Sequence, residues 1–408
     1  MSVTAADAAS CALHDAGTCR SCPHLSLPMP DQLAAKQSRV AALLAEHVPA
    51  ELWQAPAASA PTGFRNKAKM AVAGTTAHPT LGILDGAGCG VDLRTCPLHV
   101  PAIEAALPVL ADLITELGLR PYDVPTRRGE LKYVLVTASP DDDLMVRFVL
   151  RSRRYLERLR AAAPDLHRRL PQLAVAAVNI QSVHQAVIEG PEEIVLTEED
   201  RLLMRLSLPS PGRNGRVGRR AERAELPLYL PTRSFFQTNT AVAEALYATA
   251  RNWAEQAEPA RVWDLFCGVG GFALALAAPG RQVLGVEVSA SAIDGARAAA
   301  DLMGLDPALV RFEAGDARVL DPAAGDRAAG AQRPDLLVVN PPRRGIGEQL
   351  ATRIEASGVE RVLYSSCNPR TLAADLAHLP SMRVVRSRLF DMFPHTDHAE
   401  VLVELVRD

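Results

Sequence analysis

The chain has 408 residues, of which 48% are apolar, and a formal net charge of −3 at pH 7. This length allows two or three domains, and the near-neutral charge excludes a general attraction to nucleic acid, so any RNA affinity must come from local patches. No apolar run is long enough to cross a bilayer and no signal pattern opens the chain, so we expect a cytoplasmic protein without membrane contact. Seven cysteines without a signal favour metal binding or catalysis over a disulfide scaffold.

Three regions of the chain differ in residue composition and in predicted secondary structure. Residues 1–60 join a cysteine-rich stretch to a predicted helix at residues 31–47, where apolar side chains recur at helical spacing. Residues 61–232 contain short β-like runs between turns, which predicts a β-rich central module; the runs are KYVLVTA, LMVRFVLRS, VAAVNIQSV and EIVLTEED. Residues 233–408 alternate strands and helices, which is typical of an α/β fold with a doubly wound, mainly parallel sheet. The segments SPGRNGRVGRRAER and PAAGDRAAGAQRP are predicted to be surface loops.

The cysteines of the first region have metal-ligand spacing. Cys11, Cys19 and Cys22 follow the pattern C-x7-C-x2-C, which suits an iron–sulfur cluster or a zinc ion. A fourth ligand is expected near position 90. Cys96 precedes a proline, as fourth cluster ligands often do, whereas Cys89 lies in a glycine-rich turn, so we choose Cys96. On the residues alone, zinc remains the alternative to a cluster.

The third region begins with a predicted helix at residues 239–257 and a strand, RVWDLF, that runs into a glycine-rich loop. Glycines in residues 264–271 (DLFCGVGG) let the backbone approach a ligand closely. The next strand, RQVLGVEV, contains Glu287, about 20 residues further on, where a carboxylate would accept ribose hydroxyls. These features favour a nucleoside-bearing cofactor, although a tight turn followed by a surface glutamate gives the same pattern.

The strand PDLLVVN ends in a second ligand-binding motif. Asn340 opens the sequence NPPRRG and is expected at the carboxyl edge of the sheet, where ligands bind in such folds. The prolines fix a loop whose carbonyl groups, together with the Asn340 amide, can contact a ligand. Methyltransferases need this element and hydride-transfer enzymes do not, so the motif favours a methyltransferase.

The strand RVLYSS places a cysteine at the same edge. A thiolate of Cys367 that adds to C6 of a uracil would give C5 the carbanion character needed to accept a methyl group. A base must then remove the C5 proton, and the segment FPHTDHAEV offers His398 and Glu400, which chemistry alone does not separate. The alternative interpretation is a buried structural cysteine and solvated charges beside a strand.

Taken in order, FFQTN, DLFCGVGG, NPPRRGIG, SSCNP and FPHTDHAEV resemble the motifs of the RNA uracil-C5 methyltransferases. The resemblance runs from the first cysteines to the C-terminus, and it implies a Rossmann-like class I domain that uses S-adenosylmethionine. It implies Cys367 as the nucleophile and Glu400 as the base, with Asp316 near the adenine. The cofactor contacts that it implies are Gln237, Phe266, Glu287 and Asn340.

The resemblance also bears on the cysteines. It implies a [4Fe–4S] cluster in a structural or RNA-positioning role, held by Cys11, Cys19, Cys22 and Cys96. One branch of the family lacks these cysteines, and another carries an extra domain before more closely spaced ones. Only ten residues precede Cys11, so we expect no such domain here. The branch implied is the one that methylates a uridine in 23S ribosomal RNA.

An RNA-facing surface is expected beside the predicted site. The target uracil must leave its stack to reach Cys367, so we expect a flipped-out uridine in an RNA loop. Basic clusters that would contact phosphates, or would simply be solvated, are Arg65, Lys67 and Lys69, then Arg127 and Arg128, then residues 151–154. Aromatic residues for stacking, or for core packing, are Phe235, Phe236 and Phe393. We expect a monomer.

Two other functions compete with this interpretation. An amino-group methyltransferase would use Asn340, but such enzymes usually place an aromatic residue after the prolines, where this chain has Arg343. An iron–sulfur RNA-binding protein without catalysis is disfavoured because both presumed catalytic residues are present.

Overall fold

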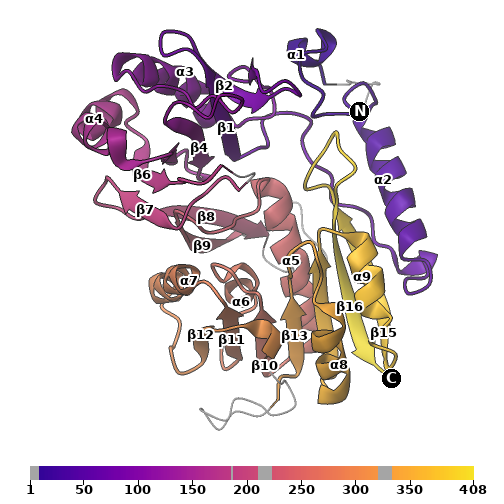
Figure 1. Ribbon diagram of the computed structural model, residues 1–408. Coiled ribbons are helices and arrows are strands. Elements are labelled where there is room, and N and C mark those ends of the chain that lie inside the picture. The colour runs from indigo at the N-terminus through magenta and orange to yellow at the C-terminus, as the bar shows by residue number, and fades with distance from the viewer. Residues whose placement is uncertain (1–8, 185–186, 210–222, 320–332) are drawn as a thin grey trace.

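The computed structural model describes residues 9–184, 187–209, 223–319 and 333–408. Two seven-stranded sheets and a two-stranded ribbon form the framework, and the ribbon lies between the two sheets (Figure 1). The two predicted surface loops fall almost entirely at residues 210–222 and 320–332, outside the described residues. Among the residues described, every helix is too short or too polar to cross a lipid bilayer.

The C-terminal sheet is doubly wound, as the alternation of strands and helices predicts. Its strand order is β12-β11-β10-β13-β14-β16-β15. The strands are β10 (Arg261–Leu265), β11 (Gln282–Glu287), β12 (Val310–Ala314), β13 (Leu336–Val339), β14 (Arg361–Ser366), β15 (Met382–Phe390) and β16 (Glu400–Arg407). The first five are parallel, and β16 enters antiparallel between β14 and β15. The order reverses between β10 and β13, and ligands of such sheets bind beyond the carboxyl ends of the strands at that point.

Helices cover both faces of this sheet. On one face lie α5 (Thr240–Ala257), α6 (Gly271–Ala275) and α7 (Ala290–Leu302), with Leu246 and Ile293 in the shared core. On the other face lie α8 (Gly347–Ser357) and α9 (Pro369–Leu376), with Leu350 and Leu372 in a second core. The buried apolar residues recur at helical intervals, so each helix turns one stripe toward the sheet.

A helix from the N-terminal segment completes the second face. After the short α1 (Ala12–Asp15), helix α2 (Met29–Leu43) packs Val40 into the core that α8 and α9 share. Figure 1 shows α2 in indigo beside the yellow helix α9. The 3-10 turn η1 (Ala50–Leu52) follows, and the chain then runs along β15, with bridges from Trp53 to Ser387 and from Ala57 to Phe390.

The central module is a mixed sheet with helices on one face. Its strand order is β3-β2-β1-β4-β5-β6-β7, and only β5 and β6 pair in parallel among its described strands. The elements are β1 (Lys67–Gly74), β2 (Pro79–Leu84), β3 (Gly90–Asp92), α3 (Pro101–Glu116), β4 (Leu131–Ala138), β5 (Leu144–Leu150), η2 (Arg153–Tyr155), α4 (Leu156–Arg169), β6 (Leu173–Ile180) and β7 (Glu192–Val195). Residues of α3 and α4, such as Leu107 and Leu159, pack on the sheet in one core.

The ribbon connects this module to the C-terminal sheet. Strands β8 (Arg201–Pro209) and β9 (Arg223–Pro231) are antiparallel, and alternate side chains of β8, such as Met204 and Leu206, are buried. These side chains join the core of α5, α6 and α7, so the ribbon covers that core. The motif FFQTN follows directly after β9.

Candidate functional site

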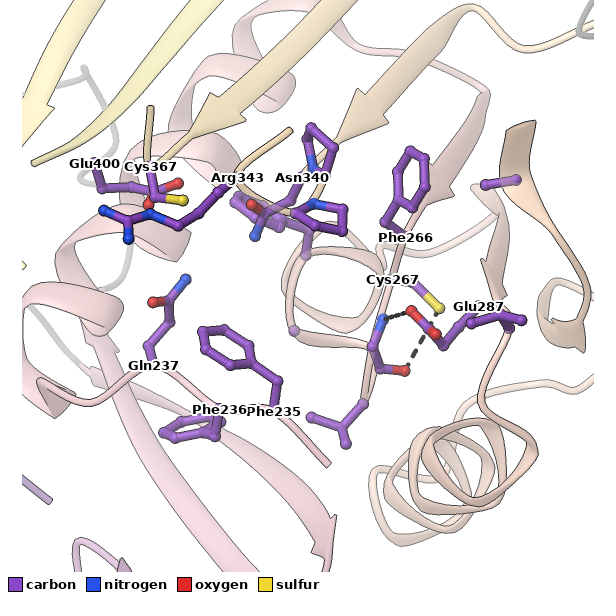
Figure 2. Close-up of a pocket in the computed structure, with 18 of the residues that line it drawn as sticks. Phe235, Phe236, Gln237, Phe266, Cys267, Glu287, Asn340, Arg343, Cys367 and Glu400 are labelled. Atoms are coloured by element: carbon purple, nitrogen blue, oxygen red, sulfur yellow. Dashed lines mark hydrogen bonds between the residues drawn. The ribbon is translucent and has the colours of Figure 1, made fainter. Parts of the chain in front are cut away.

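A cavity of about 650 Å³ opens at the carboxyl ends of β10, β13 and β14. Every motif of the C-terminal region contributes to its lining. The predicted residues that line it are Gln237, Phe266, Glu287, Asp316, Asn340, Cys367, His398 and Glu400. Figure 2 shows Cys367, Glu400 and Arg343 together at one end, Phe266 and Glu287 at the other, and Asn340 between them.

The glycine-rich loop after β10 turns through left-handed backbone conformations. Phe266 has φ of 65° and Gly270 has φ of 86°, of which the first is unusual for a residue with a side chain. Gly271 permits a close approach, because a Cβ there would lie 2.4 Å from the Tyr247 hydroxyl oxygen. The packing requires glycine at position 271, because the Tyr247 ring already fills the space that a Cβ would occupy.

Glu287 at the end of β11 faces this loop. Its Oε2 accepts a hydrogen bond from the Gly268 backbone N–H at 3.3 Å, and its Oε1 accepts one from Ser289 at 3.0 Å. These bonds fix the carboxylate at the cavity wall, where remaining lone pairs can accept ligand hydroxyls. Asp316 also lines the cavity and is half-buried, and hydrogen bonds from Arg318 lower the pKa of its carboxyl to about 2.

Strand pairing brings Cys367 and Glu400 together. In the antiparallel ladder of β14 and β16, Ser366 is opposite Val401 and Ser365 is opposite Leu402. One residue further along, Cys367 is therefore opposite Glu400, the first residue of β16. Both side chains line the cavity, so a thiol faces a carboxyl group at the same edge of the sheet.

The Glu400 carboxyl group is almost fully enclosed. It is 2% exposed, and burial raises its pKa to about 7, partly offset by a hydrogen bond from the Ser365 hydroxyl to Oε1. A carboxyl group with this pKa can take up or release a proton near neutral pH. Ser365 carries no signal in the sequence as a functional residue, because its role depends on the pairing with β16.

The Cys367 thiol is half-buried beside a positive charge. Burial raises its pKa, the charge of Glu400 raises it further, and the Arg343 guanidinium lowers it. Asn368 caps α9 by accepting from the Arg370 N–H, and its amide donates to the Arg343 carbonyl at 2.9 Å. The loop of Arg343 and the loop of Cys367 are thereby tied together.

His398 also lines the cavity, but its ring is already engaged. Arg343 Nη2 lies 2.7 Å from His398 Nδ1, so the ring accepts and is neutral in this geometry. Burial lowers the pKa of His398, and the charge of Arg343 lowers it further. The Phe393 ring packs edge-on against His398 at a centroid distance of 6.0 Å. The positive charge at this end of the cavity therefore belongs to Arg343.

Gln237 is held by the central module. The Asn66 amide donates to the Gln237 carbonyl at 3.0 Å and to the Thr240 hydroxyl at 2.9 Å. Gln237 is buried and its side chain points toward Arg343 and Cys367 (Figure 2). Phe236 is buried, whereas Phe235 is 71% exposed at the rim. No sequence motif marks Asn66, which stands between two basic residues.

The four selected cysteines lie in one neighbourhood. Burial, together with the nearby thiols of Cys96, Cys19 and Cys11, raises the pKa of Cys22 to about 11. Cys89 is exposed, and its N–H donates to the Asp85 side chain at 2.8 Å. Within the described ranges, no three or more His, Cys, Asp or Glu side chains are arranged so as to hold a metal ion. The number and the chemistry of the four thiols fit the ligands of a cluster. Their positions in the described structure do not form a metal site.

The predicted basic clusters are unequal. Lys69, Arg127, Arg128 and Arg151 are exposed, as phosphate contacts require. Lys67 is half-buried, and burial lowers its pKa to about 8. Sequence alone does not separate Lys67 from Lys69, because they are two positions apart on β1 and therefore face the same side of the sheet.

The chain is similar to proteins of known activity. The family model described as tRNA (uracil-5-)-methyltransferase matches residues 224–408. A protein of Halothiobacillus neapolitanus named 23S rRNA (uracil(747)-C(5))-methyltransferase RlmC is 49% identical, with 97% of this chain and 99% of that protein covered. The protein of the same name in Escherichia coli K12 is 46% identical, with the same coverage.

One solved structure shares the fold over most of the chain. It is the Pyrococcus abyssi tRNA (uracil-54, C5)-methyltransferase in complex with S-adenosyl-L-homocysteine. The TM-score is 0.73 at 23% sequence identity, with 94% of this chain and 85% of the other covered. The likeness supports the Rossmann-like core that the sheet order shows.

The packing at Gly271 gives a testable consequence. We expect Gly271→Ala to lower the melting temperature, with a cost of about 1–3 kcal/mol, because the new Cβ would force the Tyr247 ring out of place. Differential scanning calorimetry measures the effect. Gly86→Ala is the matched control, since a Cβ at Gly86 meets nothing within 4 Å. Equal melting temperatures for the two variants would contradict the packing argument.

Proposed function

We propose that this chain, which belongs to the RlmC family of 23S rRNA (uracil-C5)-methyltransferases, transfers a methyl group from S-adenosylmethionine to C5 of a specific uridine in 23S ribosomal RNA. The observation that carries the proposal is the pairing of β14 with β16, which sets Cys367 opposite Glu400. The cavity extends from this pair to Glu287 and the glycine-rich loop, so it can hold a base and a nucleoside cofactor together.

Cys367 is the proposed nucleophile. Its thiolate adds to C6 of the uracil, the C5–C6 double bond opens, and the electron pair is delocalised over C5 and the C4 oxygen. When bound, the cofactor would supply a sulfonium-bound methyl group, so that C5 could take up the methyl as the S–CH3 bond breaks and a neutral thioether leaves. The Arg343 guanidinium favours the thiolate, opposing the burial and the Glu400 charge that raise the pKa of Cys367.

Glu400 is the proposed base. Its carboxylate removes the C5 proton, the C5–C6 double bond re-forms, and the C6–S bond breaks to return the Cys367 thiolate. The position opposite Cys367 and the pKa of about 7 support Glu400. His398 is less suited, because its Nδ1 already accepts from Arg343.

We assign the cofactor to the other end of the cavity. Glu287 would accept hydrogen bonds from the ribose hydroxyls, and Phe266 and Asn340 would contact the cofactor between the loop and the NPPRRG motif. Gln237, whose side chain points toward Arg343 and Cys367, would contact the part of the cofactor that lies nearest Cys367, and Asp316 would approach the adenine. These assignments rest on the lining of the cavity and on the family motifs.

We assign a [4Fe–4S] cluster to Cys11, Cys19, Cys22 and Cys96. The mutual effect of these thiols on the pKa of Cys22 supports the choice of Cys96 over the exposed Cys89. Four thiolates would supply all the protein ligands of such a cluster, which would then tie the N-terminal segment to the central module. The proposed role is structural.

The proposed substrate form is a flipped-out uridine in an RNA loop. A half-buried Cys367 at the end of a cavity is accessible only to a base that has left its stack. Phe235, exposed at the rim, offers a face for stacking a neighbouring base, and Lys69, Arg127 and Arg128 offer charges for phosphates. We propose that the chain acts as a monomer.

Covalent trapping tests the nucleophile and the RNA class. With S-adenosylmethionine and a 23S rRNA fragment that contains 5-fluorouridine, we expect a protein–RNA adduct that survives a denaturing gel. Fluorine cannot leave as a proton does, so the thioether bond persists. Cys367→Ala should abolish the adduct completely. An adduct with transfer RNA alone would overturn the proposed substrate, and none with either RNA would overturn the covalent mechanism.

The pKa of Glu400 predicts a pH dependence for release. Because the base acts as a carboxylate, breakdown of the methylated adduct should speed up as pH rises through about 7, by roughly tenfold per unit below it. Rapid quenching on ordinary uridine RNA measures the breakdown. Glu400→Gln should accumulate adduct on ordinary uridine at every pH. A midpoint in the usual range of glutamate would show that burial does not set this step.

The cluster assignment predicts a difference between two cysteines. Cys22→Ser should lose the iron content and visible absorption of the purified protein, whereas Cys89→Ser should keep both. Elemental analysis of both variants measures iron and zinc together. Zinc in place of iron in the wild-type protein would favour a zinc site. Loss of iron only in Cys89→Ser would show that Cys89, and not Cys96, is the fourth ligand.

A further inference from the structure

Helix α2 forms hydrogen bonds with the segment at residues 391–399, which leads into Glu400. Lys36 Nζ donates to Asp391 Oδ1 at 2.5 Å and to the Phe393 carbonyl at 2.9 Å. The Lys36 and Asp391 side chains are only 4% and 2% exposed, so this ion pair is sealed from water. One lysine thus holds both the side chain and the backbone of a segment located more than 350 residues away in sequence.

A second pair of contacts holds the middle of the same segment. The His395 N–H donates to Gln32 Oε1 at 3.0 Å, and the Gln32 amide nitrogen lies 3.2 Å from His395 Nδ1. On its other side, His395 Nε2 lies 2.7 Å from the Pro61 carbonyl oxygen. An amide donor at Nδ1 and a carbonyl acceptor at Nε2 together specify a neutral ring with its proton on Nε2.

His395 needs this support because its backbone is strained. Its φ is 63°, which is rarely adopted by residues with a side chain, and the residue is fully buried. Such a conformation persists only where its surroundings hold it from several sides. The contacts from Gln32 and Pro61 meet that requirement, so the path of the chain from Asp391 to Glu400 depends on α2.

The segment held in this way carries one half of the proposed chemistry. Phe393, His398 and Glu400 line the cavity, whereas Gln32 and Lys36 are not among its lining residues. Cys367 comes from a different element, since it follows β14 and its loop is tied to Arg343 through Asn368. Loss of the α2 contacts should therefore displace Glu400 more than it displaces Cys367.

We infer that Lys36 and Gln32 are positioning residues that hold Glu400 in place for removal of the C5 proton, so that helix α2 controls the release step rather than the attack. This inference rests on the proposed function. It assigns to the N-terminal helix a part in the reaction that neither its sequence nor its distance from the cavity suggests.

The test separates attack from release in variants that keep the fold. Replacing both members of a buried ion pair leaves no unpaired charge, so the double variant Lys36→Met with Asp391→Asn should fold. We expect its rate of adduct formation on 5-fluorouridine RNA to stay within about twofold of wild type. On ordinary uridine RNA, its adduct should accumulate because breakdown slows by roughly tenfold or more, the loss expected when a base is misplaced.

Two further variants separate positioning from general stability. Gln32→Met removes the contacts to His395 without touching the ion pair, and should show the same accumulation of adduct. Leu44→Ala leaves a cavity in the core where α2 packs, so it should lower the melting temperature while formation and breakdown keep their wild-type ratio. Ser38→Ala, at an exposed position of α2, should change neither.

The outcomes distinguish the inference from the function on which it rests. Wild-type breakdown rates in both the double variant and Gln32→Met would overturn the inference and leave the proposed function standing. Equal slowing of formation and breakdown would also overturn it, because α2 would then support the whole site. If the wild-type protein forms no adduct on 5-fluorouridine RNA, the proposed chemistry fails and the inference fails with it.

Discussion

The site depends on the register between β14 and β16. Side chains alternate across a strand, so a slip of one residue would turn Glu400 away from Cys367 and onto the opposite face of the sheet. Glu404 holds the register: it is 1% exposed, it pairs with Arg361 of β14 at 3.0 Å, and it also pairs with Arg386 of β15. A shifted strand would bury this carboxylate without its partners, at a cost of several kcal/mol. The buried charge of Glu404 therefore specifies on which face of the sheet Glu400 lies.

The electrostatics of the cavity follow from this placement. A buried carboxyl opposite a half-buried thiol penalises the state in which both are ionised, and the Arg343 guanidinium is the charge that offsets it. Arg343 is fixed through its backbone to Asn368 and through its side chain to His398. Residues of the motifs SSCNP and FPHTDHAEV thus both contact Arg343 of the motif NPPRRG, so the three motifs form one site.

Much of the fold could be predicted because its signals are local. The alternation of strands and helices and the glycine-rich loop predicted the doubly wound sheet, and the edge motifs predicted which residues line its cavity. The contacts of Asn66 with Gln237 and of Lys36 with Asp391 could not be predicted, because each joins residues more than 170 positions apart. A lysine on an amphipathic helix indicates a solvated face, and only the tertiary structure shows that Lys36 is sealed against the last strands. Ser365 and Glu404 likewise acquire their roles from strand pairing.

The interleaving of the N-terminal segment with β15 and β16 sets an order of events during synthesis. Helix α2 leaves the ribosome long before Asp391 and His395 exist, with 355 residues still to be added before Lys36 meets its partner. At about 5–20 residues per second, this wait is on the order of 20–70 s, during which the apolar stripe of α2 lacks its final contacts. Contacts of such sequence separation also form slowly once the chain is complete. Until the last strands are made, the apolar face of α2 around Val40 therefore lacks the core that buries it in the finished protein.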